Sequence, residues 1–198
     1  AHFALGTIAA RQHRLAPAAR RFARVLREVP DHPEARLRLA RVRLMQGDRA
    51  RATRNLRREL ARLRKAETPW TPDRLRELGV LLLDAEMPRE AAFAFFRLVR
   101  ATPDDPQAHH HLGVACLQSG MARPGVRAER RAVRLDPTIV EAWHNLSLAY
   151  LRAGRWKRAS MCLKRAAALS PADPNIRRLK VKARLDRVRA VLGRLFRF

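Results

Sequence analysis

Apolar side chains recur along the chain at steps of three and four residues, the spacing that places them on one face of an α-helix. Leu75, Leu78 and Leu82 show this spacing within one segment. The 12 prolines fall at intervals between the apolar runs and the 8 glycines are spread thinly, which argues against a disordered chain and against a barrel or sandwich. The pattern predicts an all-α protein of short helices separated by proline-marked turns.

The helical pattern repeats with a fixed period. Residues 142–146 align with residues 108–112 at a shift of 34, and the same shift superimposes Gly154 on Gly120 and Pro171 on Pro137. Further shifts of 34, 39 and 34 residues carry the pattern back to the beginning of the chain. One unit cannot bury its apolar stripe alone, so stacked neighbours are expected to supply a continuous core.

The repeating unit resembles the tetratricopeptide repeat, a helix-turn-helix marked by W-x2-L-G-x2-Y, then A-x3-F, then P. The matching positions are Leu5, Gly6, Ala18, Phe22 and Pro30; Leu39, Ala40, Gly47, Ala52 and Leu56; Leu78, Gly79, Ala91, Phe95 and Pro103; and Trp143, Leu146, Tyr150, Ala159 and Pro171. The fourth unit departs most, because Gly125 replaces the small alanine and Glu129 replaces the aromatic residue. The resemblance implies a right-handed superhelical solenoid of about five repeats, whose first helices line a concave surface.

We expect one domain over residues 1–198, with repeats at about 1–32, 33–71, 72–105, 106–139 and 140–173 and a capping helix at 175–198. The second repeat has a lengthened second helix, Arg49 to Lys65, and a linker in which Trp70 is predicted to pack rather than to bind a ligand. The capping helix is predicted to be amphipathic, with its apolar residues at steps of four and three: Val181, Leu185, Val188, Leu192 and Leu195, followed by Phe196 and Phe198.

The chain is strongly basic. It has 43 Lys plus Arg against 18 Asp plus Glu, a formal net charge of +25. The excess falls in two blocks, +12 over residues 1–71 and +15 over residues 106–198, with −2 between them. Such an excess attracts polyanions. The candidates on second helices and on the last helix are Arg51, Arg54, Arg58, Arg127, Arg130, Arg131, Arg134, Arg177, Arg178, Lys180, Lys182 and Arg184.

No local motif predicts catalysis, a cofactor or a metal. The sequence lacks a nucleophile elbow, a Gly-rich phosphate loop, a metalloprotease motif and a calcium loop, so we expect a protein that is not an enzyme. His110 and His144 occupy equivalent positions in adjacent units, but packed helices lie about 8–10 Å apart, too far for easy sharing of a zinc ion. Cys116 and Cys162 lie in apolar helical stretches without disulfide spacing, which favours a reducing, cytoplasmic location.

From these residues we expect neither a membrane span nor an N-terminal leader. The longest apolar runs, such as Gly79 to Leu83, are far shorter than the roughly 20 residues that cross a bilayer. The chain begins at Ala1 inside a predicted helix, so we expect a piece of a longer protein.

The resemblance implies a binding groove on the first helices, where exposed residues would contact a peptide or a partner chain. These residues are Leu37, Arg38, Arg41, Met45, Arg76, His110, His111, Gln118, His144, Asn145 and Arg152. Asn145 stands where asparagines of the family bond a bound backbone. The equivalent positions hold other residues, and the carboxylate clamp of the chaperone-binding members is incomplete.

Three functions are therefore open. The first is a scaffold that holds a segment of a partner protein, with an acidic partner favoured by the charge of the chain. The second is RNA or DNA binding through the basic surface, for which only Phe3, Trp70 and the terminal phenylalanines are expected to offer stacking rings. The third, least favoured, is peripheral membrane attachment through the last helix, which requires its apolar stripe to be undocked.

Overall fold

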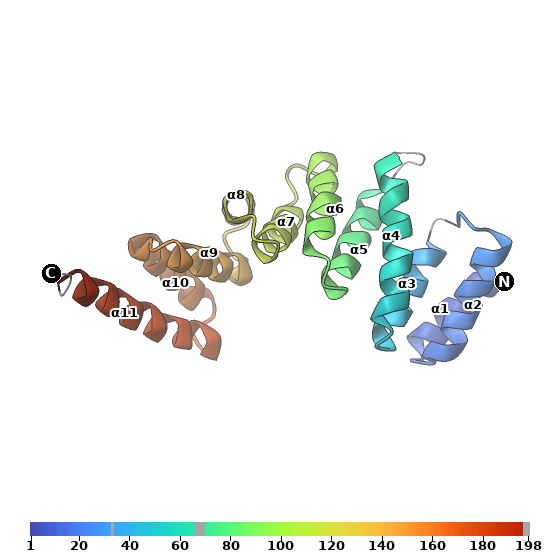
Figure 1. The fold of residues 1–198 in the computed structure, drawn as a ribbon, viewed down its shortest axis with the longest axis horizontal. Coiled ribbons are helices and arrows are strands. Elements are labelled where there is room, and N and C mark those ends of the chain that lie inside the picture. Colours follow the sequence, from blue (N-terminus) through green and yellow to red (C-terminus); the bar gives the residue numbers. More distant parts are fainter. Residues whose placement is uncertain (33, 66–69, 196–198) are drawn as a thin grey trace. The chain divides into compact units, whose positions relative to one another are not determined.

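The computed structural model describes residues 1–32, 34–65 and 70–195, with side chains as far as Val188 except that of Asp186. Over these residues the chain forms helices and no strand, which confirms the all-α prediction (Figure 1). In chain order the helices are α1 (His2–Arg11), α2 (Leu15–Glu28), α3 (Ala35–Met45), α4 (Arg49–Lys65), α5 (Pro72–Asp84), α6 (Pro88–Ala101), α7 (Pro106–Gln118), α8 (Ala122–Leu135), α9 (Val140–Arg152), α10 (Trp156–Leu169) and α11 (Pro174–Leu195).

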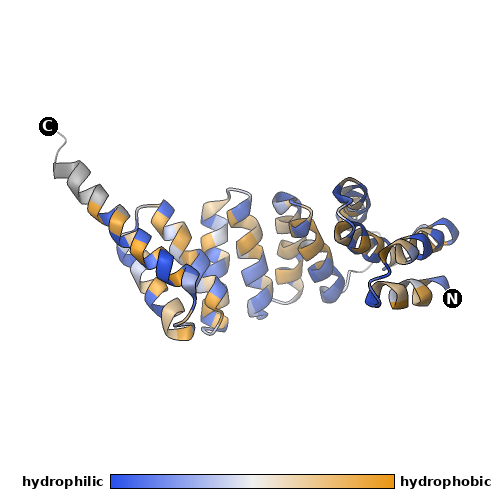
Figure 2. Cartoon of the chain, turned by 90° about the horizontal axis from the view of Figure 1, so that it is seen from below, coloured by the Kyte–Doolittle hydropathy of each residue, from blue (hydrophilic) through white to orange (hydrophobic). Residues whose placement is uncertain are grey.

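The helices belong to two compact units, Ala1–Pro103 and Asp104–Phe198. In the first unit α1 packs on α2, α3 on α4 and α5 on α6, and α3 also contacts α2 and α5. In the second unit α7 packs on α8 and α9 on α10, while α8 contacts α9 and α11 packs on α10. Bands of hydrophobic and hydrophilic residues alternate along the helices (Figure 2). Each hairpin therefore buries its apolar stripe between its own helices and against a neighbour in the same unit.

The two helices of a hairpin approach closely where a small residue of the first helix faces a larger side chain of the second. A Cβ atom on Gly79 would lie 2.5 Å from the ring of Phe95, and one on Gly6 would lie 2.9 Å from the ring of Phe22. In the second and fifth hairpins the residue on the first helix is larger than glycine, and the residue that faces it is smaller than phenylalanine. These pairs are Ala40 with Leu56 and Ser147 with Leu163. The side chain of the second helix is therefore smaller where that of the first helix is larger, as close packing requires.

The turn inside each hairpin has one residue in the left-handed conformation. Gly47, Gly120 and Gly154 have φ values of 75°, 82° and 65°, and the equivalent His13 and Glu86 have φ values of 54° and 59°. A non-glycine residue in this conformation costs about 1–2 kcal/mol. Hairpin packing, rather than local preference, therefore fixes the turn in the first and third hairpins.

A recurring hydrogen bond joins first helices to the turn that precedes them. The donor occupies the tryptophan position of the repeat, and the acceptor is the carbonyl of the proline that closes the preceding unit. The pairs are Trp143 Nε1 to Pro137 at 2.8 Å, Arg177 Nε to Pro171 at 3.3 Å, and the Arg36 guanidinium to Pro30. Arginine thus keeps the donor where the indole is absent, and α11 begins in the same way as the first helix of a hairpin.

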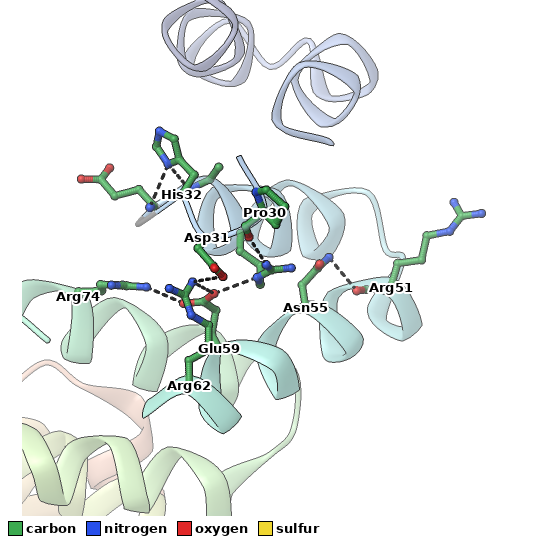
Figure 3. Close-up of polar contacts among 11 residues, drawn as sticks. Pro30, Asp31, His32, Arg51, Asn55, Glu59, Arg62 and Arg74 are labelled. Atoms are coloured by element: carbon green, nitrogen blue, oxygen red, sulfur yellow. Dashed lines mark hydrogen bonds and ion pairs between the residues drawn. The ribbon is translucent and has the colours of Figure 1, made fainter. Parts of the chain in front are cut away.

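A buried carboxylate joins the second and third hairpins (Figure 3). Glu59 of α4 is fully buried, with Arg36 Nε of α3 at 2.9 Å and Arg74 Nη2 of α5 at 2.7 Å from its oxygens. Arg62 Nη1, one turn along α4, lies 3.3 Å from Oε1. These charge-assisted hydrogen bonds satisfy both carboxylate oxygens, so the cost of burying the charge is offset by partners from three helices.

The second hairpin is lengthened, as its sequence indicates. Helix α4 has 17 residues, against 14 in α2, α6, α8 and α10. The predicted linker residues 66–69 lie outside the described residues. Trp70 is half-buried, and the Arg74 guanidinium lies 4.0 Å from the centroid of its ring. Arg74 belongs to the cluster that Glu59 forms with Arg36, Arg62 and Arg74, here called the Glu59 cluster. The Trp70 ring therefore packs against a member of this cluster, which agrees with the predicted packing role.

The last helix docks through a different face from the predicted one. Ile176 and Leu179 are 1% and 8% exposed, whereas Val181, Leu185 and Val188 are 57%, 56% and 54% exposed. The side chains of Leu192 and Leu195, and all of Phe196 and Phe198, lie outside the described residues. Helix α11 has two apolar faces, and the spacing in the sequence indicates only the longer one. Contact with α10 buries the shorter one, which lies near the beginning of the helix.

We expect Gly79→Ala to lower the free energy of unfolding by about 1–3 kcal/mol, because the new methyl group would overlap the ring of Phe95. Phe95→Leu alone should also destabilise, because it leaves a cavity above Gly79. The double variant recreates the alanine–leucine pair of the second hairpin and should be more stable than either single variant. Urea denaturation of the three proteins tests this, and additive losses would contradict the size-matching argument.

Glu59→Ala should cost about 3–5 kcal/mol of unfolding free energy, because it leaves buried arginine charges without a partner. Glu28 is a suitable control: its ion pair with Arg24, at 3.0 Å, is solvent-exposed on both sides. Glu28→Ala should cost at most about 1 kcal/mol. Equal effects of the two substitutions on the urea midpoint would show that the Glu59 cluster does not hold the hairpins together.

Candidate functional site

The first helices line a pocket in the first unit. This pocket has a volume of about 280 Å³ and is lined by Thr7, Ala10, Arg11, Phe22, Arg38, Arg41, Val42 and Met45. Its floor is apolar, because the Phe22 ring and Val42 are buried beneath it. Three of the residues predicted for the groove, Arg38, Arg41 and Met45, come together here because they lie one turn apart along α3.

The arginines of this pocket already have carboxylate neighbours. Glu77 of α5 lies 3.0 Å from Arg41 Nη2 and 3.6 Å from Arg38 Nη1, and Arg38 also pairs with Glu34 at 3.4 Å. The Glu77 side chain is 15% exposed. It therefore orients both guanidinium groups while neutralising part of their charge.

A second pocket lies between α7 and α9 in the second unit. It has a volume of about 350 Å³ and is lined by Val114, Leu117, Gln118, Asn145, Leu148, Ala149 and Arg152. Gln118, Asn145 and Arg152 are predicted groove residues. Gly125 gives Leu117 the space that it occupies in the pocket wall, because a Cβ atom at residue 125 would lie 2.7 Å from Leu117 Cγ. The glycine that departs from the repeat pattern thus leaves room for a leucine that forms the pocket.

Glu129 takes the place of the aromatic residue in the fourth hairpin and reaches the same face. Its side chain is fully buried against Gly113, on which a Cβ atom would lie 2.5 Å from Glu129 Cγ. Asn145 Nδ2 donates to Oε1 at 2.9 Å, and His110 Nδ1 lies 3.0 Å from Oε2. Burial raises the pKa of Glu129, and the hydrogen bond from His110 opposes that rise. A carboxylate in the aromatic position therefore links α7, α8 and α9 through polar contacts.

The structure differs from the sequence predictions at three residues: Asn145, His110 and Leu37. Asn145 was expected to bond a partner's backbone, but its amide nitrogen is committed to Glu129, which leaves its oxygen for a ligand. The sequence offered no carboxylate partner for His110, and Glu129 is that partner. Leu37 was expected to be exposed, and this prediction is wrong because the side chain is fully buried in the core. Leu37 faces inwards while its neighbour Arg38 reaches the pocket.

The other predicted groove residues lie on first helices outside these two pocket linings. Arg76 is half-buried and pairs with Asp73 at 2.8 Å. The rings of His110 and His111 are 5.9 Å apart, and His144 is half-buried on α9. Among the described residues no group of three or more His, Cys, Asp or Glu side chains could hold a metal ion.

Neither cysteine has the surroundings of a reactive thiol. Cys116 and Cys162 are both buried and unbonded to another cysteine. Burial raises the pKa of Cys116, and it raises that of Cys162 to about 11. Both groups are therefore thiols near neutral pH and behave as small core residues.

The predicted polyanion residues are divided between the two units. They lie on α4, α8 and α11, and all are exposed except Arg131 and Lys180, which are half-buried. Arg51 pairs with Asp48 at 3.1 Å and Arg131 pairs with Asp104 at 3.0 Å. Within the part of the chain that the structure describes, no helix has the length and apolar character needed to cross a bilayer.

The raised pKa of Glu129 gives a test of the network. In the folded state this carboxyl holds its proton to a higher pH than the unfolded value of 4.5, so its contribution to stability falls as pH rises between the two values. Glu129→Gln should therefore unfold with a larger free energy than the parent protein near neutral pH, and the difference should vanish in acid. Urea denaturation at several pH values measures both curves; a Gln variant that is less stable at neutral pH would show that the pair with His110 outweighs the burial.

Comparison with known proteins agrees with this architecture. Models of the tetratricopeptide repeat match residues 9–67 and 140–185. YrrB, described as a TPR protein with an unusual peptide-binding site, is 18% identical with a TM-score of 0.75 over 90% of each chain. MamA from Desulfovibrio magneticus RS-1 is 21% identical with a TM-score of 0.71 over 87% of this chain and 95% of its own.

At these identities the structural likeness shows the fold alone, and no curated protein matches the chain in sequence. The family models, however, fall on the residues whose spacing and packing define the hairpins. The chain belongs to the tetratricopeptide-repeat family.

Proposed function

We propose that this chain is a protein-interaction scaffold that holds segments of a partner protein against the first helices of its hairpins. The observation that carries the proposal is the pair of pockets, one in each unit, that first helices line. Their apolar floors and polar rims suit a peptide, whose side chains fill hollows while its backbone and charges meet the rim.

The chemistry of the rims favours an acidic partner. Arg152 is exposed at the edge of the pocket between α7 and α9, and no ion pair among the described residues involves it. At the first pocket Arg38 and Arg41 share Glu77 and Arg38 also pairs with the exposed Glu34, so an acidic partner would compete with these carboxylates there. A chain of net charge +25 also steers acidic partners towards itself, which raises the association rate more than the affinity.

Asn145 and Gln118 supply the backbone contacts in this scheme. The Asn145 amide is held by Glu129, so its remaining oxygen is oriented before the ligand arrives. Gln118 is exposed at the end of α7 and offers both a donor and an acceptor. YrrB has a peptide-binding site by its description, which supports peptide binding as a use of this fold.

The proposal predicts selection of acidic peptides. We expect a random displayed peptide library to yield Asp-rich and Glu-rich sequences with interspersed apolar residues. Arg152→Glu should weaken a selected peptide by about tenfold or more in isothermal calorimetry, because it replaces attraction by repulsion at a partly desolvated site.

Arg165→Glu is the matched control. Arg165 lies on the exposed side of α10, in the same hairpin, and its reversal changes the net charge by the same amount. Equal losses in the two variants would mean that charge acts over the whole surface and that the pocket does not bind the peptide. Selection of peptides without acidic residues would contradict the proposed preference for an acidic partner, but it would not contradict peptide binding in the groove.

A further inference from the structure

A third pocket lies between α10 and α11, and it shares no lining residue with the first-helix pockets. Its volume is about 200 Å³, and it is lined by Trp156, Ser160, Leu163, Lys164, Lys180, Ala183, Arg184 and Arg187. Leu163 is buried at its base and Ala183 is half-buried. The sequence pattern named Lys180 and Arg184 as polyanion candidates but not the other residues, because only the docking of α11 on α10 brings the two helices together.

The pocket is lined by two facing rows of side chains. Trp156, Ser160 and Lys164 follow one another at intervals of four along α10, and Lys180, Arg184 and Arg187 follow at four and three along α11. Residues at these intervals share one face of a helix. The groove therefore has a row of cations along α11, a lysine across from it, and an aromatic ring on α10.

The cations of this groove have no ion-pair partner among the side chains that the structure describes. None of Lys164, Lys180, Arg184 and Arg187 takes part in an ion pair among the described residues, and α10 has no acidic residue in its sequence. Helix α11 has one, Asp186, against eight Lys and Arg. Like charges three and four residues apart destabilise a helix slightly. A bound anion would remove this repulsion.

Trp156 sets this groove apart from the other basic surfaces. Its ring is half-buried in the pocket lining, and no ring contact or hydrogen bond of its side chain is found in the described part of the chain. Of the aromatic residues that the sequence suggested for stacking, Phe3 contacts Phe22 and His32, and Trp70 contacts Arg74; the terminal phenylalanines lie outside the described residues. The sequence gives no sign of this role for Trp156, because nothing at the beginning of α10 indicates which helix will pack beside it.

We propose that the groove between α10 and α11 binds a short single-stranded segment of nucleic acid, whose phosphates follow the cations and whose base stacks on Trp156. A row of cations beside an aromatic ring is the combination that single-strand binding requires. A free inorganic anion would not need the ring, and a flat bilayer surface cannot enter a groove between two helices. Binding here is independent of the first-helix pockets, so either proposal can fail without the other.

The test measures binding of a fluorescein-labelled single-stranded RNA by anisotropy. The intact chain should bind it at low salt, with an affinity that falls linearly with salt on logarithmic axes. Lys180→Glu combined with Arg184→Glu should weaken binding by about tenfold more than the control pair, Arg178→Glu with Lys182→Glu. The control residues are exposed on the other side of the same helix and change the net charge equally. Circular dichroism checks that each variant is folded.

Trp156→Leu should weaken binding by about fivefold or more at constant charge, because a stacked base is lost. Equal losses in the two charge-reversed pairs, or an unchanged affinity of Trp156→Leu, would overturn the proposal. So would equally tight binding of the matching duplex, or preferential binding to phosphatidylserine vesicles that depends on Val181 and Leu185.

A second measurement does not depend on variants. Photocrosslinking of a 4-thiouridine RNA to the unaltered chain should label peptides that contain Trp156 or the row from Lys180 to Arg187. Labelling confined to other helices would also overturn the proposal.

Discussion

The structure depends on the close approach of two helices at one small residue in each hairpin. Gly6 and Gly79 lie directly under phenylalanine rings, and the hairpins with Ala40 or Ser147 have leucine at the facing position. The combined size of the two facing side chains is nearly the same in these four hairpins, as close packing at a similar helix separation requires. Because neighbouring hairpins stack through the surfaces that this separation defines, a change at one such pair alters the packing of the next hairpin as well.

The fourth hairpin satisfies the same constraint with a charged residue. Glu129 fits over Gly113 as a phenylalanine would, but its carboxylate must then find hydrogen-bond partners, which His110 and Asn145 provide. Glu59 shows the other solution to a buried carboxylate, with arginines of three helices around it. Both networks join two neighbouring hairpins, and the first also orients Asn145, which lines a pocket.

The positive charge of the chain is distributed in three different ways. Some arginines are paired internally, such as those around Glu59 and beside Glu77. Others are exposed singly on second helices, where solvent and salt screen them. A third group lines the groove between α10 and α11 together with Trp156. Net charge alone therefore says little about where a polyanion would bind; the places where cations share a hollow and lack carboxylates are more informative.

The sequence by itself determined the all-α class, the family and the hairpin positions, because the spacing of small, apolar and proline residues is a local property that recurs. It also placed Arg38, Arg41, Met45, Gln118, Asn145 and Arg152 on first helices, since their order along a helix fixes their face. Only the tertiary structure decided that Leu37 is core, that Glu129 reaches His110 and Asn145, and that α11 docks through Ile176 and Leu179. These outcomes depend on which of two available faces another helix covers, and that choice is set by packing between segments that are distant in the sequence.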